Sequence, residues 1–304
     1  MAEVIVIGSR GSALALWQAN HIAACLTALG VPTRIEVIKT TGDKIQDVPL
    51  ATVGGKGLFT KEIEEALLDK TIDLAVHSLK DVPTALPAGL ILAAIPEREE
   101  PRDALIGARV SGLRDGSRIG TSSLRRSSQL RALNANLRVE MLRGNVDTRL
   151  RKLDGGQYDA IVLAAAGLRR LGWQDRITEL IPVEVMCPAV GQGALAIETR
   201  DDRGLAQEFA RKLDHAPSRG AVTAERALLE TLGGGCQVPV GAHAVIDGSS
   251  VYLRAIVATP DGARIVKGES RGPDPSALGH ALGERLLNDG AREILQAVYS
   301  PEVA

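Results

Sequence analysis

The chain has 304 residues, a formal net charge of −1 and 45% hydrophobic residues. Near neutrality argues against a protein that binds nucleic acid through its overall charge. Aromatic residues make up only 2%, too few for base-stacking platforms that hold single-stranded nucleic acid. At about 150 residues per domain, this length predicts two or three domains.

The first residues, MAEVIVIG, place an acid where a secretory signal would carry positive charge. Their apolar run is too short for an export or membrane segment. We therefore expect a cytoplasmic protein with no membrane partner. Cys25, Cys187 and Cys236 are widely spaced and form neither a CxxC pair nor a zinc-ligand pattern, so we expect no disulfide framework and no metal.

The first third of the chain predicts a βαβαβ unit. An apolar stripe at Ile22, Cys25, Leu26 and Leu29 indicates one helix, and a second helix is expected over residues 57–70. Alternation of strands and helices implies a parallel sheet. Strands are expected at residues 3–7, 34–39 and 71–77.

The scheme recurs after a hinge-like stretch at residues 97–102. The letters IGS and IDLAV of the first unit correspond to IGT and YDAIV of the second. Two similar α/β lobes with a cleft between them are therefore expected, and clefts between domains are common ligand sites. In the second lobe we expect strands at residues 117–120, near Val139 and at 158–163, with helices from Ser122 and Asn145.

The last part of the chain predicts a smaller α+β domain. It contains a helix, a glycine loop, strands with turns at residues 247–248 and 260–262, and a closing helix over 275–298. The PAVGQG segment predicts a second crossing between the lobes, after which residues 194–198 return as a strand of the first. The predicted domains are residues 1–97 with 194–212, residues 102–188, and residues 216–304.

Positive charge is concentrated in the second lobe. Eight arginines and no lysine lie from Arg118 to Arg151, against only Glu140 and Asp147. A planar guanidinium binds a carboxylate or phosphate through two parallel hydrogen bonds. GTSSLRR and LRGNVDTR are typical of strand ends that turn into helix starts, where anions are favoured. A polyanionic ligand is predicted, although a solvated helix face is the interpretation we prefer for three of these arginines: Arg131, Arg138 and Arg151.

One thiol and one carboxyl group stand out as candidates for chemistry. Cys236 follows three glycines, which free the backbone to approach a ligand, although a single cysteine is more often a small buried hydrophobe. We give that second interpretation to Cys25 and Cys187. Asp81 follows an apolar strand and is either an acid that exchanges a proton near a developing cation or half of a turn ion pair with Lys80.

Two neighbouring features have simpler interpretations. His77 is interpreted as a structural hydrogen-bonding residue. The VGGKGLF run lacks the spacing of a phosphate loop and has no Ser or Thr after its lysine, so a nucleotide triphosphate site is not expected. Lys56 in this run still suits a carboxylate.

Six motifs together resemble the porphobilinogen deaminase family, also called hydroxymethylbilane synthase. The similarity runs nearly end to end and is carried by VGGKGLF, AVHSLKDVP, GTSSLRR, LRGNVDTRL, PAVGQGA and GGGCQVP. The fold expected with it has two periplasmic-binding-protein-like α/β lobes around a cleft and a small C-terminal α+β domain. The implied enzyme is a transferase of tetrapyrrole (haem and chlorophyll type) biosynthesis. It joins four porphobilinogen units head to tail, releases ammonia at each step and frees hydroxymethylbilane by hydrolysis.

The resemblance also implies a cofactor and roles for particular residues. A dipyrromethane would be bound permanently through a thioether to Cys236 and would prime the growing chain. Asp81 would be the catalytic aspartate, assisting loss of the amine and stabilising positive charge on pyrrole nitrogens. A monomer with porphobilinogen as its small-molecule partner is implied. The residues expected to bind cofactor or substrate are Arg10, Ser12, Gln18, Asp43, Lys56, Ser78, Lys80, Thr121, Ser122, Ser123, Arg125, Arg126, Arg143, Gly144, Arg149 and Arg170.

Two departures from the family pattern affect the N-terminal loops. Thr52 stands where some relatives have lysine, and Ala13 replaces a proline. A pure solute-binding module and an arginine-rich nucleic-acid binder are the alternative functions. The missing export signal and the glycine-flanked thiol count against the first, and neutrality with few aromatic residues counts against the second.

Overall fold

The computed structural model describes residues 4–44, 57–233 and 238–299. The chain divides into two compact units, Met1–Glu99 with Gly193–Arg219 and Glu100–Gln192 with Gly220–Ala304. The first unit holds one five-stranded sheet, and the second holds a five-stranded and a three-stranded sheet. Within the described residues, no helix has the length and apolar character needed to cross a membrane.

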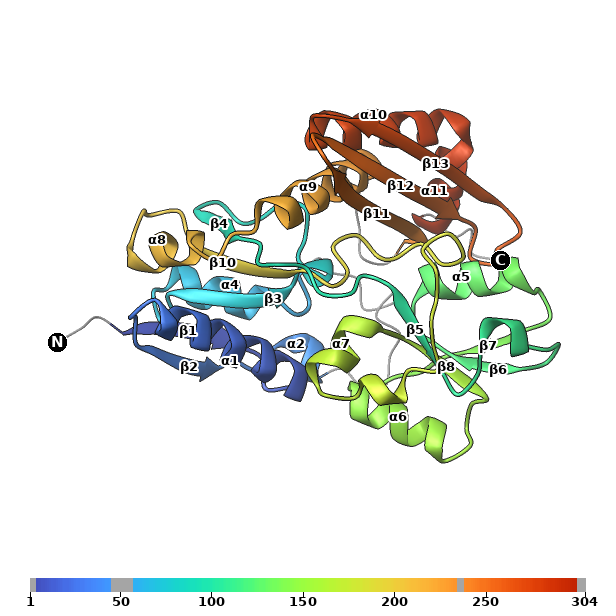
Figure 1. The fold of residues 1–304 in the computed structure, drawn as a ribbon, viewed down its shortest axis with the longest axis horizontal. Helices are drawn as coiled ribbons and strands as arrows, with labels where there is room; N and C mark the ends of the chain where they lie inside the picture. Colours follow the sequence, from blue (N-terminus) through green and yellow to red (C-terminus); the bar gives the residue numbers. More distant parts are fainter. Residues whose placement is uncertain (1–3, 45–56, 234–237, 300–304) are drawn as a thin grey trace. The chain divides into compact units, whose positions relative to one another are not determined.

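The sheet of the first unit has the strand order β2-β1-β3-β10-β4 (Figure 1). The first three of these strands are parallel, and β10 runs antiparallel to both of its neighbours. The predicted return of residues 194–198 to this lobe is confirmed, whereas β4 was not predicted. The strands are β1 (Ile5–Ser9), β2 (Thr33–Val37), β3 (Leu74–Ser78), β4 (Leu90–Ala94) and β10 (Leu195–Arg200).

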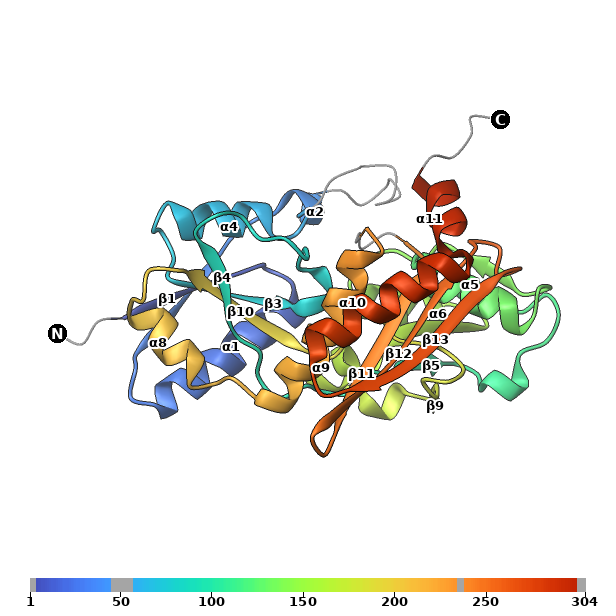
Figure 2. The same cartoon turned by 90° about the horizontal axis from the view of Figure 1, so that it is seen from above.

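Helices cover both faces of this sheet. Ile22 of α1 and Ala206 of α8 pack on one face, while Ile63 and Leu67 of α4 pack on the other, an arrangement that Figure 2 shows from above. Because helices cover both faces, the strand ends are the part of this sheet at which a ligand can approach. The helices are α1 (Ala13–Ala28), α2 (Thr41–Lys44), α4 (Lys61–Leu68) and α8 (Leu205–Arg211).

The five-stranded sheet of the second unit repeats this plan in the order β7-β6-β8-β5-β9. Again three strands are parallel, and the fourth in the order, β5, is antiparallel to both neighbours. The internal repeat inferred from IGS and IGT is therefore a repeat of strand order. The strands are β5 (Asp103–Ile106), β6 (Arg118–Gly120), β7 (Arg138–Glu140), β8 (Ala160–Ala164) and β9 (Glu179–Leu180).

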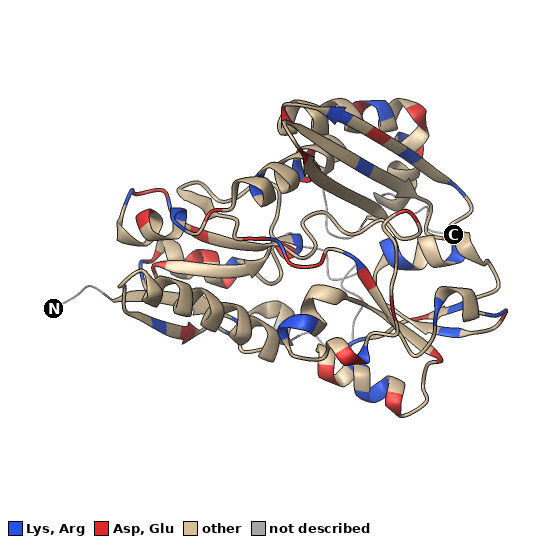
Figure 3. Cartoon of the chain, in the orientation of Figure 1, with Lys and Arg blue, Asp and Glu red and all other residues tan. Residues whose placement is uncertain are grey.

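Helices again lie on opposite faces of this sheet. Leu130 of α5 packs with Leu105 and Ile119, and Leu150 of α6 packs with Ile161 on the other face. Figure 3 shows basic residues on α5 and both signs of charge on α6. The elements are α5 (Leu124–Leu133), α6 (Val146–Asp154), α7 (Ala165–Arg170) and two 3-10 turns, Val110–Gly112 and Gln174–Arg176.

The three-stranded sheet β11-β12-β13 is antiparallel, with tight turns where the sequence predicts them. Leu282 and Leu286 of α10 share a core with Leu228 of α9 and Leu253 of β12, and α10 lies over β12 and β13 (Figure 2). The elements are α9 (Ala216–Thr231), β11 (Val240–Asp247), β12 (Ser250–Ala258), β13 (Ile265–Gly272), α10 (Pro275–Leu286) and α11 (Arg292–Tyr299).

The expectation of one closing helix over residues 275–298 is wrong. A π-helical turn, Leu287–Ala291, separates α10 from α11. Gly290 within it has φ 105°, which only glycine adopts without strain. A Cβ at this position would also collide with the guanidinium of Arg264. The pattern of apolar residues continues through the kink, which is why periodicity alone missed it.

Candidate active site

Polar side chains of the first unit gather after the carboxyl ends of β1 and β3. These strands are parallel, so the two ends lie side by side: Arg10 and Ser12 follow β1, while Ser78 ends β3 and Lys80 follows it. Ser12 begins α1 by accepting a hydrogen bond from the Ala15 amide at 3.3 Å. The guanidinium of Arg10 lies 4.1 Å from the ring centre of Phe59.

Gln18 joins this group although it lies on a helix. It is buried on α1 with 3% exposure, and its Nε2 donates to Ser78 Oγ at 2.9 Å. The structure therefore brings two predicted site residues from separate segments into direct contact. The hydrogen bond also fixes the start of the turn that carries Asp81.

Asp81 ends a single 3-10 turn, Leu79–Asp81, which directly follows β3. Leu79 is buried and anchors the turn, while Asp81 is half-buried. Its carboxyl group makes no hydrogen bond or ion pair with any residue that the structure describes. A half-buried acid without a neutralising partner is what proton transfer or cation stabilisation requires.

His77 has the structural role expected of it. Its Nε2 lies 3.0 Å from Glu198 Oε2, and the two side chains are 4% and 0% exposed. Glu64 is also nearly buried, and burial raises the pKa of its carboxyl group, with the charge of Glu198 adding to the effect. These groups lie between β3, β10 and α4, inside the lobe rather than at its strand ends.

In the second unit, the two arginine-rich motifs lie side by side. Ser122 Oγ donates to the carbonyl of Leu142 at 2.6 Å, which joins the GTSS and LRGN segments. Ser123 caps α5 by accepting from the Arg126 amide, and Thr121 Oγ accepts from the Ser123 amide at 3.2 Å. The start of α5 is therefore held in a fixed backbone conformation.

The LRGN segment places Arg143 just before α6. Gly144 has φ 108°, and a Cβ there would collide with Thr148, so this turn requires glycine. Arg149 Nε donates back to the Gly144 carbonyl at 2.8 Å. The Nε of Arg143 is buried, with no acceptor among the described residues, so a donor is available to a ligand.

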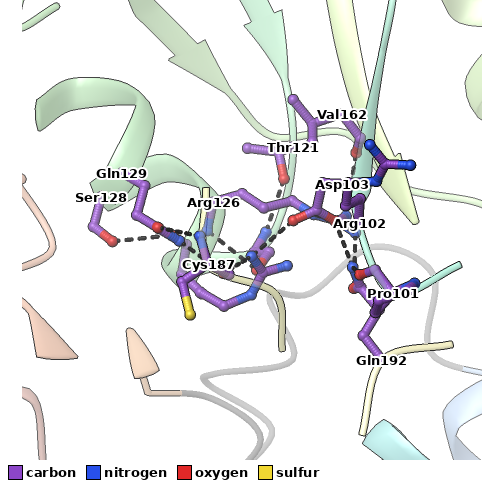
Figure 4. Close-up of polar contacts among 12 residues, drawn as sticks. Pro101, Arg102, Asp103, Thr121, Arg126, Ser128, Gln129, Val162, Cys187 and Gln192 are labelled. Atoms are coloured by element: carbon purple, nitrogen blue, oxygen red, sulfur yellow. Dashed lines mark hydrogen bonds and ion pairs between the residues drawn. The ribbon is translucent and has the colours of Figure 1, made fainter. Parts of the chain in front are cut away.

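Arg125 and Arg126 converge on one carboxylate, that of Asp103. Figure 4 shows Arg126 and Gln192 beside this carboxylate. Arg125 Nη1 donates to Oδ2 at 2.8 Å, and Arg126 donates to Oδ1 through Nη2 at 2.7 Å and Nε at 3.0 Å. Gln192 Nε2 adds a fourth hydrogen bond to this carboxylate, donating to Oδ1 at 2.9 Å. Burial would raise the pKa of Asp103, but the two guanidinium groups outweigh burial and hold that pKa below its usual range.

Comparison with known proteins identifies the family to which the sequence is similar. Residues 5–208 match the family described as "Porphobilinogen deaminase, dipyromethane cofactor binding domain", and residues 220–288 match "Porphobilinogen deaminase, C-terminal domain". The chain belongs to the porphobilinogen deaminase family. The resemblance found in the six motifs is thereby confirmed.

Relatives named porphobilinogen deaminase match over almost the whole chain. That of Syntrophobacter fumaroxidans is 50% identical over 304 residues, covering 98% of each chain. That of Geobacter metallireducens is 52% identical and covers 98% of this chain and 96% of the relative. Among solved structures, the methionine-binding protein MetQ aligns over 69% of this chain and 89% of its own, with 13% identity and a TM-score of 0.45.

The roles that the family resemblance implies for particular residues remain predictions. Cys236 and Lys56 lie outside the described residues, as does the side chain of Asp43 in α2. Arg170 is 8% exposed at the end of α7. The other assigned residues lie at the strand ends and helix starts described above, or on α1 in the case of Gln18.

The remaining arginines and thiols have ordinary structural roles. Arg151 is exposed and pairs with Asp147 at 3.1 Å, as expected of a solvated helix face. Arg138 is also exposed, but it lies on strand β7 rather than on a helix. Arg131 donates to the Pro260 carbonyl at 2.8 Å, a contact that the sequence did not predict. Cys187 is 2% exposed, and burial raises the pKa of its thiol to about 12, which confirms that it is structural.

Sequence reasoning missed the acid to which Arg125 and Arg126 donate. Asp103 opens β5 and is fully buried, but residues 97–102 before it resembled a hinge. One signal was available, because an acid at the start of an apolar run requires a buried partner. Gln192 and Gln129, which bond Asp103 and the Cys187 backbone, gave no comparable signal.

Proposed function

We propose that this protein is a porphobilinogen deaminase that condenses four porphobilinogen units head to tail, releases ammonia and forms hydroxymethylbilane. The observation that carries the proposal is that two arginine side chains have buried N–H donors without a hydrogen-bond acceptor among the described residues. The Nε atoms of Arg125 and Arg143 are both buried with no acceptor among the described residues. A substrate whose every pyrrole bears two carboxylates supplies such acceptors.

The same donors suit a dipyrromethane cofactor. When bound, the dipyrromethane supplies the pyrrole carbon at which the product chain grows. Cys236 would hold it through a thioether, because three glycines before the thiol leave the sulfur accessible. The residues that would bind its carboxylates include Arg125, Arg126, Arg143 and Arg149, supported by the hydroxyl groups of residues 121–123.

Asp81 would perform the proton chemistry. Its carboxyl group follows the buried strand β3 on a short, anchored turn and carries no other described partner. From there it would donate a proton to the departing amine and oppose positive charge that develops on pyrrole nitrogen. Gln18 and Ser78 hold the turn in place through their 2.9 Å hydrogen bond.

The expected partners and location form part of the same proposal. We infer a monomer that acts in the cytoplasm on a small-molecule substrate, with no nucleic-acid or membrane partner, and a C-terminal domain from residue 216 that carries the cofactor cysteine. Analytical ultracentrifugation with and without porphobilinogen tests the monomer. A concentration-dependent dimer would contradict it.

Ammonia release tests the activity directly. Purified protein incubated with porphobilinogen should release four molecules of ammonia for each hydroxymethylbilane formed, as the condensation requires. A solute-binding module would bind porphobilinogen and release none. Saturable binding without ammonia would therefore contradict the proposal and favour that alternative.

A further inference from the structure

Asp103 occupies an unusual position for a carboxylate. It is 0% exposed, at the first residue of β5, and both of its oxygens accept hydrogen bonds from arginine. Arg125 and Arg126 are themselves 4% and 6% exposed. Three charged groups are thus removed from water together, which is costly unless their geometry is well defined.

The two arginines would not converge without a shared acceptor. Consecutive residues on an α-helix point about 100° apart, since each turn takes 3.6 residues. Arg125 and Arg126 nevertheless direct their guanidinium groups at the two oxygens of one side chain. Arg125 Nη1 also donates to the Cys187 carbonyl at 2.7 Å, and Arg126 Nη1 donates to the Val162 carbonyl at 3.2 Å. Asp103 is the only charged acceptor in these hydrogen bonds.

The charges of the cluster do not cancel. Two guanidinium groups and one carboxylate leave a net positive charge, and Gln192 and Gln129, which complete the hydrogen bonds, are neutral. Arg125 also keeps a buried Nε without an acceptor among the described residues. The cluster is therefore both oriented by Asp103 and still able to attract an anion.

We propose that Asp103 is a positioning residue for ligand binding: it holds Arg125 and Arg126 in one orientation and leaves them a net positive charge for a ligand carboxylate. This inference rests on the proposed function, which makes those arginines the receivers of pyrrole carboxylates. Asp103 itself does not touch the ligand. Its alternative role is purely structural, as an acid that stabilises the fold of the second unit.

The test replaces Asp103 with asparagine, which preserves shape and removes the charge. The matched control is Asp159→Asn, because Asp159 also pairs with an arginine of the same sheet, Arg118, at 2.9 Å but on the surface. Each variant is examined for folding by circular dichroism, for covalently bound cofactor by intact mass, and for the KM and kcat of porphobilinogen turnover.

A positioning role predicts a split between KM and kcat. In folded Asp103→Asn, KM should rise about tenfold or more, since binding of the substrate and of the transition state is weakened alike. The kcat, expressed per molecule that carries cofactor, should change by less than about threefold. The fraction of molecules that carry cofactor should also fall. Asp159→Asn should match the wild type in every readout. A KM within about twofold of wild type in folded Asp103→Asn overturns the proposal, as does a loss of activity that only follows the folded fraction.

A second variant and a direct measurement keep the inference testable if Asp103→Asn does not fold. Asp103→Glu retains the charge but moves it by one methylene. Its KM should also rise about tenfold or more, and a KM within about twofold of wild type would overturn the proposal. In the wild type, NMR should find the Arg126 Nε proton protected from solvent exchange, because that atom bonds Asp103. Rapid exchange of this proton would overturn the inference without reference to turnover. Failure of wild-type ammonia release would instead contradict the proposed function.

Discussion

Asp81 and Arg143, like Arg125, are proposed site residues with a polar group that has no hydrogen-bond partner among the described residues. Each has a polar group that is shielded from water at least in part and that lacks a partner within the described parts of the chain. Buried polar groups in proteins are almost always hydrogen-bonded, so an unpartnered group among the proposed site residues is a candidate for ligand contact or chemistry. These two residues therefore give the sharpest predictions at the scale of single side chains.

Replacing Asp81 with alanine should lower kcat for porphobilinogen by about 10²- to 10⁴-fold, the usual range for a general acid or base. The fold should survive, because the side chain forms no hydrogen bond or ion pair with a described residue that the variant would break. Steady-state ammonia release together with circular dichroism provides the measurement. Asp69→Asn, which alters an exposed carboxyl group after α4 in the same unit, should behave as wild type. Retained turnover in folded Asp81→Ala would remove Asp81 from the mechanism.

Replacing Arg143 with leucine should reduce kcat/KM about 10- to 100-fold, because one charge-assisted hydrogen bond to a ligand carboxylate contributes about 1.5–3 kcal/mol. Partially elongated products should accumulate and be visible by mass spectrometry. Arg138→Leu is the control, since Arg138 is exposed on β7. Equal kinetics for the two variants would show that Arg143 is an ordinary surface charge.

At the scale of elements, two hairpin turns of the C-terminal sheet differ in what surrounds them. Gly262 has φ 75°, and a Cβ there would meet backbone atoms of Ser128 and Ala132 in α5. Gly248 has φ 61°, with no atom within 4 Å of such a Cβ. The turn at Gly262 is thus a close contact between the hairpin and the helix that carries Arg125 and Arg126.

Replacing each glycine with alanine separates two contributions to the free energy of unfolding: backbone strain at a positive φ, and the contact between the hairpin and α5. Gly248→Ala should cost about 1–2 kcal/mol of unfolding free energy, which is the strain of a left-handed residue. Gly262→Ala carries the same strain and must also move the hairpin away from α5, so it should cost at least about 1 kcal/mol more. Urea unfolding measures both values. Equal losses would mean that the hairpin yields freely and that the contact with α5 contributes little.

The buried acids between β3, β10 and α4 predict a pH dependence of stability. Burial raises the pKa of Glu64, so the folded state retains this proton to higher pH than the unfolded state, whose glutamate pKa is about 4.3. Stability is then lost as the pH rises from the unfolded pKa through the folded one. Glu64→Gln removes this loss and should be more stable than wild type at neutral pH, with the difference vanishing below the unfolded pKa.

Thermal unfolding from acid to neutral pH tests the Glu64 prediction. Glu65→Gln is the control, because Glu65 is exposed on the same helix and forms only a 3.9 Å surface pair with Lys61. Its difference from wild type should vary little with pH. If Glu64→Gln is less stable than wild type at neutral pH, the carboxylate is stabilised by neighbours rather than penalised by burial.

Elements with a strong local pattern could be predicted from the sequence, and elements defined by distant partners could not. The parallel strands β1, β3 and β8 are mainly apolar runs, and both hairpin turns contain glycine. By contrast, β4, β5 and β9 were missed. These strands are short and form only by pairing with distant segments: β4 with β10, β5 with β8, and β9 with β5. The kink at Gly290 was hidden because the apolar pattern continues through it.

The whole molecule repeats one α/β plan and uses the two copies differently. The first copy presents a lone carboxyl group at the end of β3, and the second presents arginines at the start of α5 and before α6. Arginine clustering could be predicted because it is visible in composition. The acid that orders the cluster could not, because Asp103 and Arg125 are 22 residues apart and meet only through sheet topology.

Intact mass of the purified protein is the most direct test of the central claim, that cationic groups hold an acid-bearing oligopyrrole tethered to Cys236. Protein made in cells that synthesise porphobilinogen should exceed its sequence mass by one dipyrromethane. Cys236→Ser should lose that increment, while Cys187→Ser, which alters the buried thiol, should keep it. A wild-type mass equal to that of the bare chain, or an increment that survives in Cys236→Ser, would contradict the account.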